Sequence, residues 1–151
     1  MLLKPAAINL RPANAADADA IKLLLAANGL PTDDLHDAML ANFLVAIDDN
    51  GIIGVIGAEV FGENALLRSL CTRKELRQQG VGRALTMALI QKLTDQGVRH
   101  VFLLTESAEN FFARHGFSRV KRADVPAEIA ETEQFRSLCP ASAVCMQREL
   151  K

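Results

Sequence analysis

Short apolar runs separated by turn residues predict a chain rich in β-strands. Runs dominated by Val, Ile, Leu and Phe are typical of strands, and glycine, asparagine and aspartate mark their ends. Asn50-Gly51 is the strongest of these turn signals and predicts a hairpin between two of the strands. The predicted strands cover residues 8–12, 43–47, 52–61, 65–72, 100–105, 117–120 and 141–150.

Other segments place apolar residues three or four positions apart, as one face of a helix does. Asn14 can cap the first of these helices and Gly29 can end it. Gly54 and Gly57 interrupt a predicted strand and indicate a bulge or a close backbone approach there. The predicted helices cover residues 15–28, 32–40, 81–96, 108–115 and 126–131. Because a helix separates the strands at 65–72 and 100–105, we expect these two strands to be parallel neighbours.

The segment 70–93 reads as a strand, a glycine-containing loop and a helix. Gly80 and Gly82 remove side chains where a ligand has to come close to the backbone. The backbone N–H groups of residues 78–83 lie at a helix start, where orphan donors and the helix dipole favour phosphate. The spacing fits neither a Walker A loop nor a complete dinucleotide fingerprint. A pyrophosphate loop is therefore predicted, with a plain helix start containing two glycines as the alternative.

Two motifs in this order resemble the GNAT superfamily of N-acetyltransferases. The first is Arg77-x-x-Gly80-x-Gly82, which resembles the acetyl-CoA loop of that family. The second is Ala108-x-x-Phe111-Phe112-x-x-x-Gly116-Phe117, which resembles the helix that covers the pantetheine arm. The resemblance covers nearly the whole chain. It implies an α/β fold in which helices flank a central, mixed, twisted sheet, and a single N-acetyltransferase domain over residues 1–151.

Finer resemblances concern the kind of acetyltransferase. Residues 103–117 are similar to the acetyltransferase domain of N-acetylglutamate synthases. Residues 66–70, 111–114 and the tail 135–146 resemble the arsenic-resistance N-acetyltransferase family still more closely. This resemblance implies a bacterial enzyme associated with arsenic detoxification, and it leaves the acetylated substrate open.

The GNAT resemblance also implies which residues bind acetyl-CoA, the cosubstrate. Backbone groups of the strand that precedes the loop would bond the pantetheine amides, the loop would hold the pyrophosphate, and two phenylalanines would cover the pantetheine arm. The residues at the matching positions are Leu70, Cys71, Thr72, Arg77, Gln78, Gln79, Gly80, Val81, Gly82, Arg83, Phe111 and Phe112.

Acetyl transfer to an amine needs a group that accepts a proton and benefits from one that donates a proton. Many family members donate from a tyrosine at the position of Phe112, but this chain contains no tyrosine. Thr105 matches a hydroxyl position of the synthase-like domains, and its alternative role is to cap the following helix. Glu59 is the candidate base, and its alternative role is a cross-strand ion pair with Arg68.

Arginines within apolar strands suggest an anionic acceptor. Arg68 interrupts a buried strand and needs a partner, which is either Glu59 or an anionic group of the substrate. Arg11 is the second candidate. Leu66 and Pro140 stand where the synthase-like domains carry a glutamate and an arginine, so glutamate specificity cannot simply be transferred. Soft thiolates bind arsenic, but Cys71, Cys139 and Cys145 form no compact ligand motif, and no metal is predicted.

Net charge and cysteine content limit which partners and which cellular compartment we expect. A net charge of −1 gives no reason to expect nucleic acid or an anionic membrane surface as a partner. The odd cysteine count, together with the lack of an apolar leader, predicts a cytoplasmic protein. We expect a small-molecule amine as substrate, and the C-terminal strands suggest a homodimer. The competing hypotheses are a glutamate N-acetyltransferase, a non-catalytic acyl-CoA sensor and a protein N-terminal acetyltransferase.

Overall fold

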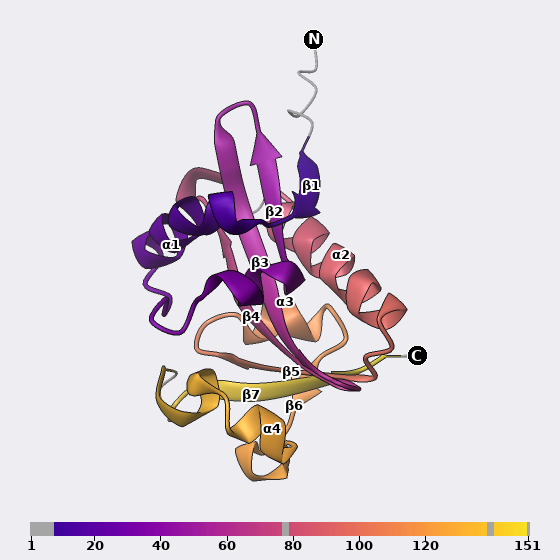
Figure 1. The fold of residues 1–151 in the computed structure, drawn as a ribbon. Coiled ribbons are helices and arrows are strands. Elements are labelled where there is room, and N and C mark those ends of the chain that lie inside the picture. The colour runs from indigo at the N-terminus through magenta and orange to yellow at the C-terminus, as the bar shows by residue number, and fades with distance from the viewer. Residues whose placement is uncertain (1–7, 77–78, 139–140, 151) are drawn as a thin grey trace. The chain divides into compact units, whose positions relative to one another are not determined.

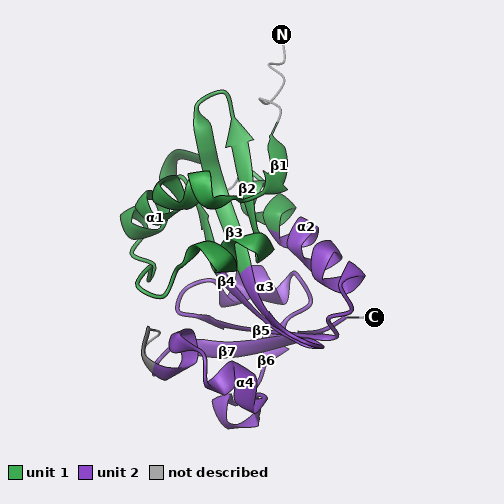
Figure 2. Ribbon diagram, in the orientation of Figure 1, with its two compact units in different colours: residues 1–57, 69–85 green, residues 58–68, 86–151 purple. Residues whose placement is uncertain are grey.

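The computed structural model describes residues 8–76, 79–138 and 141–150. The chain divides into two compact units, coloured separately in Figure 2. Unit 1 consists of residues 1–57 and 69–85, and unit 2 of residues 58–68 and 86–151. Strands β3 (Gly51–Phe61) and β4 (Asn64–Thr72) each contribute residues to both units. The strand order of the mixed sheet is β1-β2-β3-β4-β5-β7-β6.

Unit 1 is built on antiparallel strands covered by a helix. β1 pairs with β2, and β2 pairs with β3 through a register shift between Ala46 and Ile47 (Figure 1). Its other elements are β1 (Asn9–Pro12), η1 (Ala15–Asp17), α1 (Ala18–Ala27), η2 (Asp37–Asn42), β2 (Phe43–Asp48), η3 (Lys74–Leu76) and the start of α2 (Val81–Asp95). Buried side chains of α1, β2 and β3 pack together here, among them Ile21, Leu25, Phe43, Val45 and Val55.

Two of the three glycines in β3, Gly54 and Gly57, mark close approaches, as predicted. A Cβ on Gly57 would lie 2.3 Å from the ring of Phe43. A Cβ on Gly54 would lie 2.9 Å from Cγ1 of Val81 at the start of α2. These glycines therefore let a ring and a helix lie directly against the strand.

Unit 2 contains the parallel pair and the C-terminal strands. β4 pairs in parallel with β5, which confirms the predicted crossover, and β7 lies between β5 and β6. Its further elements are the rest of α2, then β5 (His100–Thr105), α3 (Glu109–Ala113), β6 (Ser118–Arg119), η4 (Arg122–Asp124), α4 (Ala127–Ala130), the π-helix η5 (Gln134–Leu138) and β7 (Val144–Glu149). Leu66, Phe102 and Ile129 form a buried cluster, to which α4 contributes Ile129.

Three predicted elements were wrong in part. The helix expected at 32–40 is a 3-10 helix over Asp37–Asn42, preceded by a turn in which the N–H of Leu35 bonds the carbonyl of Thr32. His36 has an extended backbone, which ends that turn before the 3-10 helix starts. The first helix begins as η1, capped by Asn14, and the last strand starts at Val144. The π-helix was not predicted, because its short apolar spacing lacks a helical stripe.

Within the described ranges, no helix combines the length and the apolarity that crossing a bilayer requires.

Candidate functional site

The parallel ladder between β4 and β5 is short. It pairs Asn64 with His100 and ends where Leu66 pairs with Phe102, although β4 continues to Thr72 and β5 to Thr105. On its other edge, β5 is paired with β7 through to Thr105. Within the described part of the chain, residues 103–105 of β5 therefore pair with β7 but not with β4. Their edge toward β4 offers backbone groups to an extended ligand.

Ser69 follows shortly after the end of this ladder and has an unusual backbone. Its φ is +62°, and it is the one non-glycine residue with a positive φ among those described. A left-handed conformation at a residue with a Cβ costs roughly 1–3 kcal/mol and is found mostly at functional sites. The strain therefore adds to the case for a ligand site on β4.

The glycine loop leads into α2 within unit 1. Gly80 has a φ of +86° and open space where a Cβ would be, and its carbonyl accepts the N–H of Ala84. The Val81 side chain is buried against β3. Val81 can therefore contact a ligand only through its backbone. The side chains of Gln79 and Arg83 are exposed. The predicted ligand residues Arg77 and Gln78 lie outside the described residues.

The end of β4 carries the residues predicted to bond pantetheine through their backbone. Cys71 is buried, and its thiol points to the carbonyl of Leu24 in α1, with Sγ 3.6 Å from that oxygen. Leu70 and Thr72 are half-buried. The Cys71 side chain thus belongs to the core, and only the backbone of this residue remains for a ligand.

Thr105 ends β5, and its hydroxyl oxygen accepts the N–H of Ala108 at 3.0 Å. This bond caps the start of α3, which is the structural alternative raised above. A threonine hydroxyl also carries one donor proton. The cap uses the oxygen as an acceptor and leaves the direction of that proton to be set by a neighbour.

Helix α3 carries the two phenylalanines of the second motif. Phe112 is buried, with its ring edge-on to Phe117 at a centroid distance of 5.6 Å. Phe111 is half-buried, lies 5.1 Å from Phe112 and 4.7 Å from the ring of His115. The position at which many family members have a tyrosine is therefore a packed, apolar core position in this chain.

Glu59 and Arg68 form the predicted cross-strand ion pair within unit 2. Nη1 of Arg68 lies 3.1 Å from Oε2 of Glu59. The Arg68 side chain is 1% exposed, whereas that of Glu59 is 19% exposed. Glu59 therefore compensates a buried cation and is also the member of the pair that solvent or a substrate can reach.

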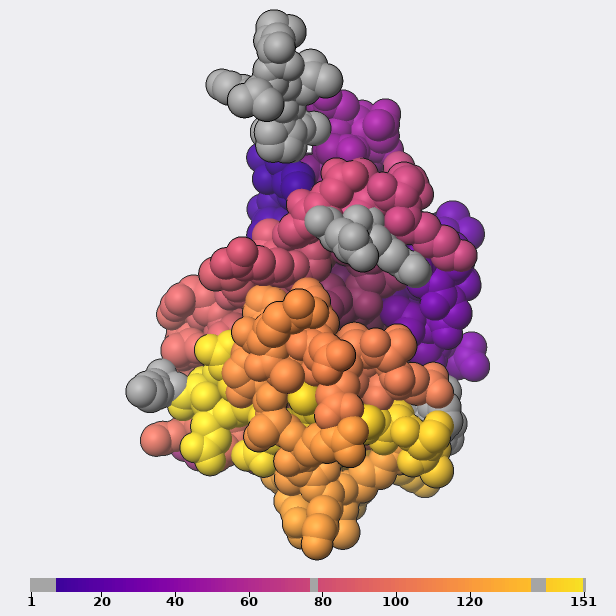
Figure 3. Space-filling view, turned by 180° about the vertical axis from the view of Figure 1, so that it is seen from behind, coloured from indigo at the N-terminus to yellow at the C-terminus, as the bar shows by residue number. Residues whose placement is uncertain are grey.

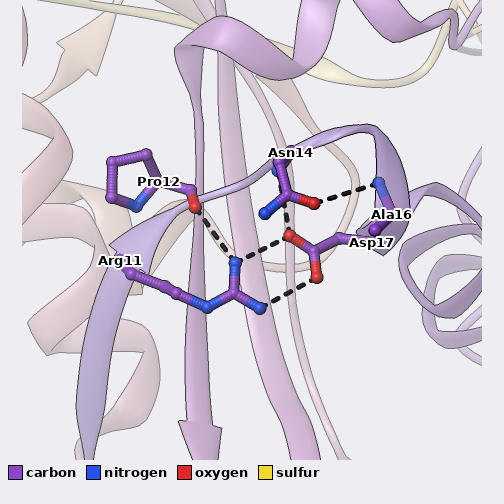
Figure 4. A network of polar contacts seen from close by, with 5 residues as sticks. All are labelled: Arg11, Pro12, Asn14, Ala16 and Asp17. Carbon is purple, nitrogen blue, oxygen red and sulfur yellow. Dashed lines mark hydrogen bonds and ion pairs between the residues drawn. The ribbon is translucent and has the colours of Figure 1, made fainter.

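Arg11 has a carboxylate partner that sequence reasoning did not assign to it. Its two terminal nitrogens donate to Asp17 at 2.7 and 2.9 Å, and Asp17 also accepts the N–H of Asn14 (Figure 4). The hydrogen bonds from Arg11 hold the pKa of Asp17 below its ordinary value, despite its burial. The Asn14-x-x-Asp17 spacing is that of a capping box at the start of η1, which signals the bond from the Asn14 N–H but not the pair with Arg11.

Two further arginines hold α3, and sequence reasoning missed both. Arg119 of β6 makes a two-pronged ion pair with Glu109, the first residue of α3. Arg148 of β7 donates from Nη1 to the carbonyl of His115 at 2.7 Å, just beyond the last residue of α3. An arginine inside an apolar strand, as at Arg148, was the available signal.

The cysteines do not gather into a thiolate site in the part of the chain that is described. No cluster of three metal-ligating side chains occurs there, and Cys139 lies outside it. Burial raises the pKa of the Cys145 thiol to about 11, which favours the neutral form.

The comparisons with known proteins agree with this picture. Residues 40–119 match the acetyltransferase (GNAT) domain family. The chain belongs to the GNAT family. The matched range runs from η2 to β6, so the short β4–β5 ladder, the glycine loop and α3 all lie within the family's domain.

Two curated relatives and one solved structure indicate the range of this family. The chain is 31% identical to an uncharacterised N-acetyltransferase of Chlorobaculum tepidum over 60% of its own length and 58% of that protein's. It is 35% identical to an amino-acid acetyltransferase of Mycobacterium tuberculosis over 47% of its own length and 40% of that protein's. The chain thus matches little more than half, or less, of each curated relative.

The solved structure is an N-acetylglutamate synthase from Neisseria gonorrhoeae, complexed with coenzyme A and N-acetyl-glutamate. It superimposes with a TM-score of 0.82 at 18% identity, over 98% of this chain and 36% of the synthase. At this identity the likeness establishes the fold, which confirms the predicted mixed sheet flanked by helices.

Proposed function

We propose that the chain is an acetyl-CoA-dependent N-acetyltransferase for a small amine, an amino acid or an amino-acid-like toxin of the arsenic-resistance type. The observation that carries the proposal is the β4–β5 ladder that ends at Leu66 and Phe102 while both strands continue. Such an edge can bond the amides of a pantetheine arm as a strand would. Membership of the GNAT family and the names of the two relatives support the same reaction class.

The fit to coenzyme A rests on this chain's own residues. The main chain of residues 70–72 would bond the pantetheine arm, and the N–H groups from Gln79 to Arg83, with Arg77 and Gln78, would hold the pyrophosphate at the start of α2. Phe111, the half-buried ring of α3, would lie against the arm, whereas Phe112, which the resemblance also implies there, is packed in the core. When bound, acetyl-CoA supplies a thioester-activated acetyl group. No metal takes part in this proposal.

Two residues are proposed to act on the reacting groups during acetyl transfer, Glu59 and Thr105. Glu59 would take a proton from the acceptor ammonium, because it is the more exposed member of its ion pair. The hydroxyl of Thr105, too weak an acid to give up its proton, would orient the leaving thiolate or a water by a hydrogen bond while its oxygen keeps the cap on Ala108. Replacing Thr105 with valine should lower kcat with little change in coenzyme A affinity, and Thr105→Ser should retain turnover. An unchanged kcat in Thr105→Val would remove Thr105 from the mechanism.

The acceptor is proposed to carry an anionic group. Arg11 and Arg68 are the candidates to bind it. Arg11, with 38% of its side chain exposed, is the more accessible and would share its guanidinium with Asp17, whereas Arg68, 1% exposed, would bind an anion only beside its partner Glu59. The relative named amino-acid acetyltransferase supports an amino-acid-like acceptor. Glutamate itself is the alternative acceptor within this class.

The test is thiol release from acetyl-CoA against a panel of amines. The panel holds glutamate, other amino acids, phosphinic and arsonic amino-acid analogues, polyamines and a peptide. Turnover confined to anionic amino acids and their analogues supports the proposal. Turnover only with polyamines or the peptide overturns the acceptor class.

A non-catalytic acyl-CoA sensor is the second candidate. It is favoured by Phe112, whose buried ring replaces the usual tyrosine acid in a chain without tyrosine. Coenzyme A that raises the melting temperature, with no thiol release for any amine, would put the sensor first.

A further inference from the structure

Helix α3 is a five-residue helix held at both ends by the C-terminal strands. β6 and β7 pair with each other, Arg119 facing Met146 across the ladder. Arg119 reaches Glu109 at the start of α3, and Arg148 reaches the carbonyl of His115 beyond its end. Seen from behind, orange residues that follow α2 in the chain cover part of the yellow C-terminal segment (Figure 3).

The two attachments differ in strength. The Arg119 side chain is 68% exposed, so water screens its pair with Glu109. Arg148 is half-buried, and its hydrogen bond to the His115 carbonyl is 2.7 Å long. A charged donor on a partly desolvated carbonyl makes one of the stronger hydrogen bonds in a protein. Arg148 is therefore the stronger of these two arginine attachments of α3.

Gly116 shows how closely Arg148 fits. A Cβ at this position would lie 3.3 Å from Nε and 3.4 Å from Cδ of Arg148, and the φ of Gly116 is +84°. The glycine of the second motif thus serves the turn after α3 and also gives Arg148 room beside it.

A short path connects Arg148 with the exposed side of α3. The backbone carbonyl of His115 accepts from Arg148, and the ring of the same histidine lies 4.7 Å from the ring of Phe111. Phe111 is the half-buried aromatic residue of the helix, whereas Phe112 is packed in the core. Moving the His115 backbone would therefore move the one ring of this pair that can meet a ligand.

We propose that Arg148 is a positioning residue for coenzyme A, acting through His115 to fix the ring of Phe111 against the pantetheine arm. This inference rests on the proposed function. It adds a residue of β7 to the binding apparatus, outside the residues 40–119 that match the family domain.

Binding of two ligands by calorimetry tests this role. The first ligand is coenzyme A, and the second is 3′-phospho-ADP, which has the same nucleotide and pyrophosphate but lacks the pantetheine arm. Arg148→Met should weaken coenzyme A binding about tenfold, a loss in the range of one charge-assisted hydrogen bond. Its affinity for 3′-phospho-ADP should stay within about twofold of the wild type, since the missing contact concerns the arm alone.

Arg114→Met is the matched control, because Nε of Arg114 donates to the carbonyl of Asn110 within α3 and attaches the helix to no strand. It should bind both ligands as the wild type does. If Arg148→Met does not fold, Arg148→Lys and His115→Ala replace it, the first keeping a cation and the second removing the ring that touches Phe111. His115→Ala should show the same selective loss for coenzyme A, and Arg148→Lys a smaller one, because lysine can still donate to the His115 carbonyl.

Equal weakening for both ligands, or none for coenzyme A, would overturn the role of Arg148 while leaving the proposed function in place. A wild-type chain that binds neither ligand would overturn the proposed function, and this inference with it.

Discussion

Arg68 is the one cation among the described residues whose side chain is almost fully removed from water. Its charge is compensated by Glu59 at 3.1 Å. A buried ion pair adds little net stability by itself, but losing one partner leaves an uncompensated charge in the interior. The pair is therefore a sensitive point of β3 and β4, whatever its role with a substrate.

Glu59→Gln should destabilise the fold by roughly 2–4 kcal/mol, less than for a fully buried pair because Glu59 is partly exposed. The double change Arg68→Met with Glu59→Leu should recover most of this loss, since no charge is then left buried. Urea denaturation measures both. Glu109→Gln, which breaks the exposed pair with Arg119, is the control and should change stability little. Equal effects of the two single changes would contradict the buried-charge argument.

Cys145 illustrates burial acting on a thiol. Its pKa is raised from 9.0 to about 11, chiefly by desolvation and against the opposing charge of Arg122. The folded state therefore binds the thiol proton more tightly, and this contribution to stability is complete below pH 9 and is lost as the pH rises toward 11.

Alkylation should accordingly spare Cys145 at pH 8 in the folded chain and label it readily in urea, because thiolate is the reactive form. Peptide mass spectrometry after iodoacetamide treatment measures the labelling at this site. Rapid labelling of Cys145 in the folded chain at pH 8 would show that the thiol is not buried as described.

At the scale of elements, β3 and the turn after it each contain a glycine whose replacement should destabilise the fold. The ring of Phe43 occupies the space that a side chain at position 57 would need. Gly62, in the turn after β3, has open space around it but a φ of +61°. Replacing Gly57 therefore tests steric crowding, and replacing Gly62 tests backbone strain alone.

Gly57→Ala should destabilise the fold by roughly 3 kcal/mol, at the upper end for overpacking, because the new methyl group would lie 2.3 Å from the Phe43 ring. Gly62→Ala, the control, should cost roughly 1 kcal/mol through its left-handed backbone. Thermal unfolding measures the difference. Adding Phe43→Leu should reduce the effect of Gly57→Ala, and full additivity of the two changes would refute the contact.

The start of α1 depends on an ionised carboxylate. Because the hydrogen bonds from Arg11 lower the pKa of Asp17, this contribution to stability is present above the unfolded pKa of 3.8 and is lost as the pH falls below it. Asp17→Asn should therefore lower stability at pH 7 by about 1 kcal/mol, discounted because Arg11 is partly exposed. The difference from the wild type should shrink at pH 3. Urea titrations at both pH values measure it, and a constant difference would exclude this linkage.

At the scale of the whole molecule, β3 and β4 supply residues to both compact units. Each of these strands is continuous from one unit into the other. Unfolding of either unit would therefore disrupt the strand pairing of both. We propose that the two units unfold together as one domain, as the sequence predicts.

Unfolding in urea should therefore follow a single transition with the same midpoint for different probes. Circular dichroism and methyl proton resonances are suitable, since the chain contains no tryptophan or tyrosine for fluorescence. Two separated transitions would show that the units are independently stable.

The sequence alone determined most of the elements and the family. Apolar runs and turn residues located the seven strands found among the described residues, because both are local signals, and two motifs with fixed spacing predicted the glycine loop and α3. Asn14 was predicted as a helix cap in the same way, whereas the return bond from its N–H to Asp17 was not predicted. Where local signals competed, as at 32–40, the prediction was wrong, because burial of Leu35 within a turn is decided by distant packing.

Only the tertiary structure decided the partners of the charged residues. Glu59 with Arg68 was one of two alternatives until the strands were aligned, and Arg11 with Asp17 required the chain to turn back on itself. Arg148 meets His115 across 33 residues of sequence, which no periodicity encodes. Register, the end of the β4–β5 ladder and the left-handed Ser69 likewise depend on long-range pairing, since a strand's neighbours are set by the whole sheet.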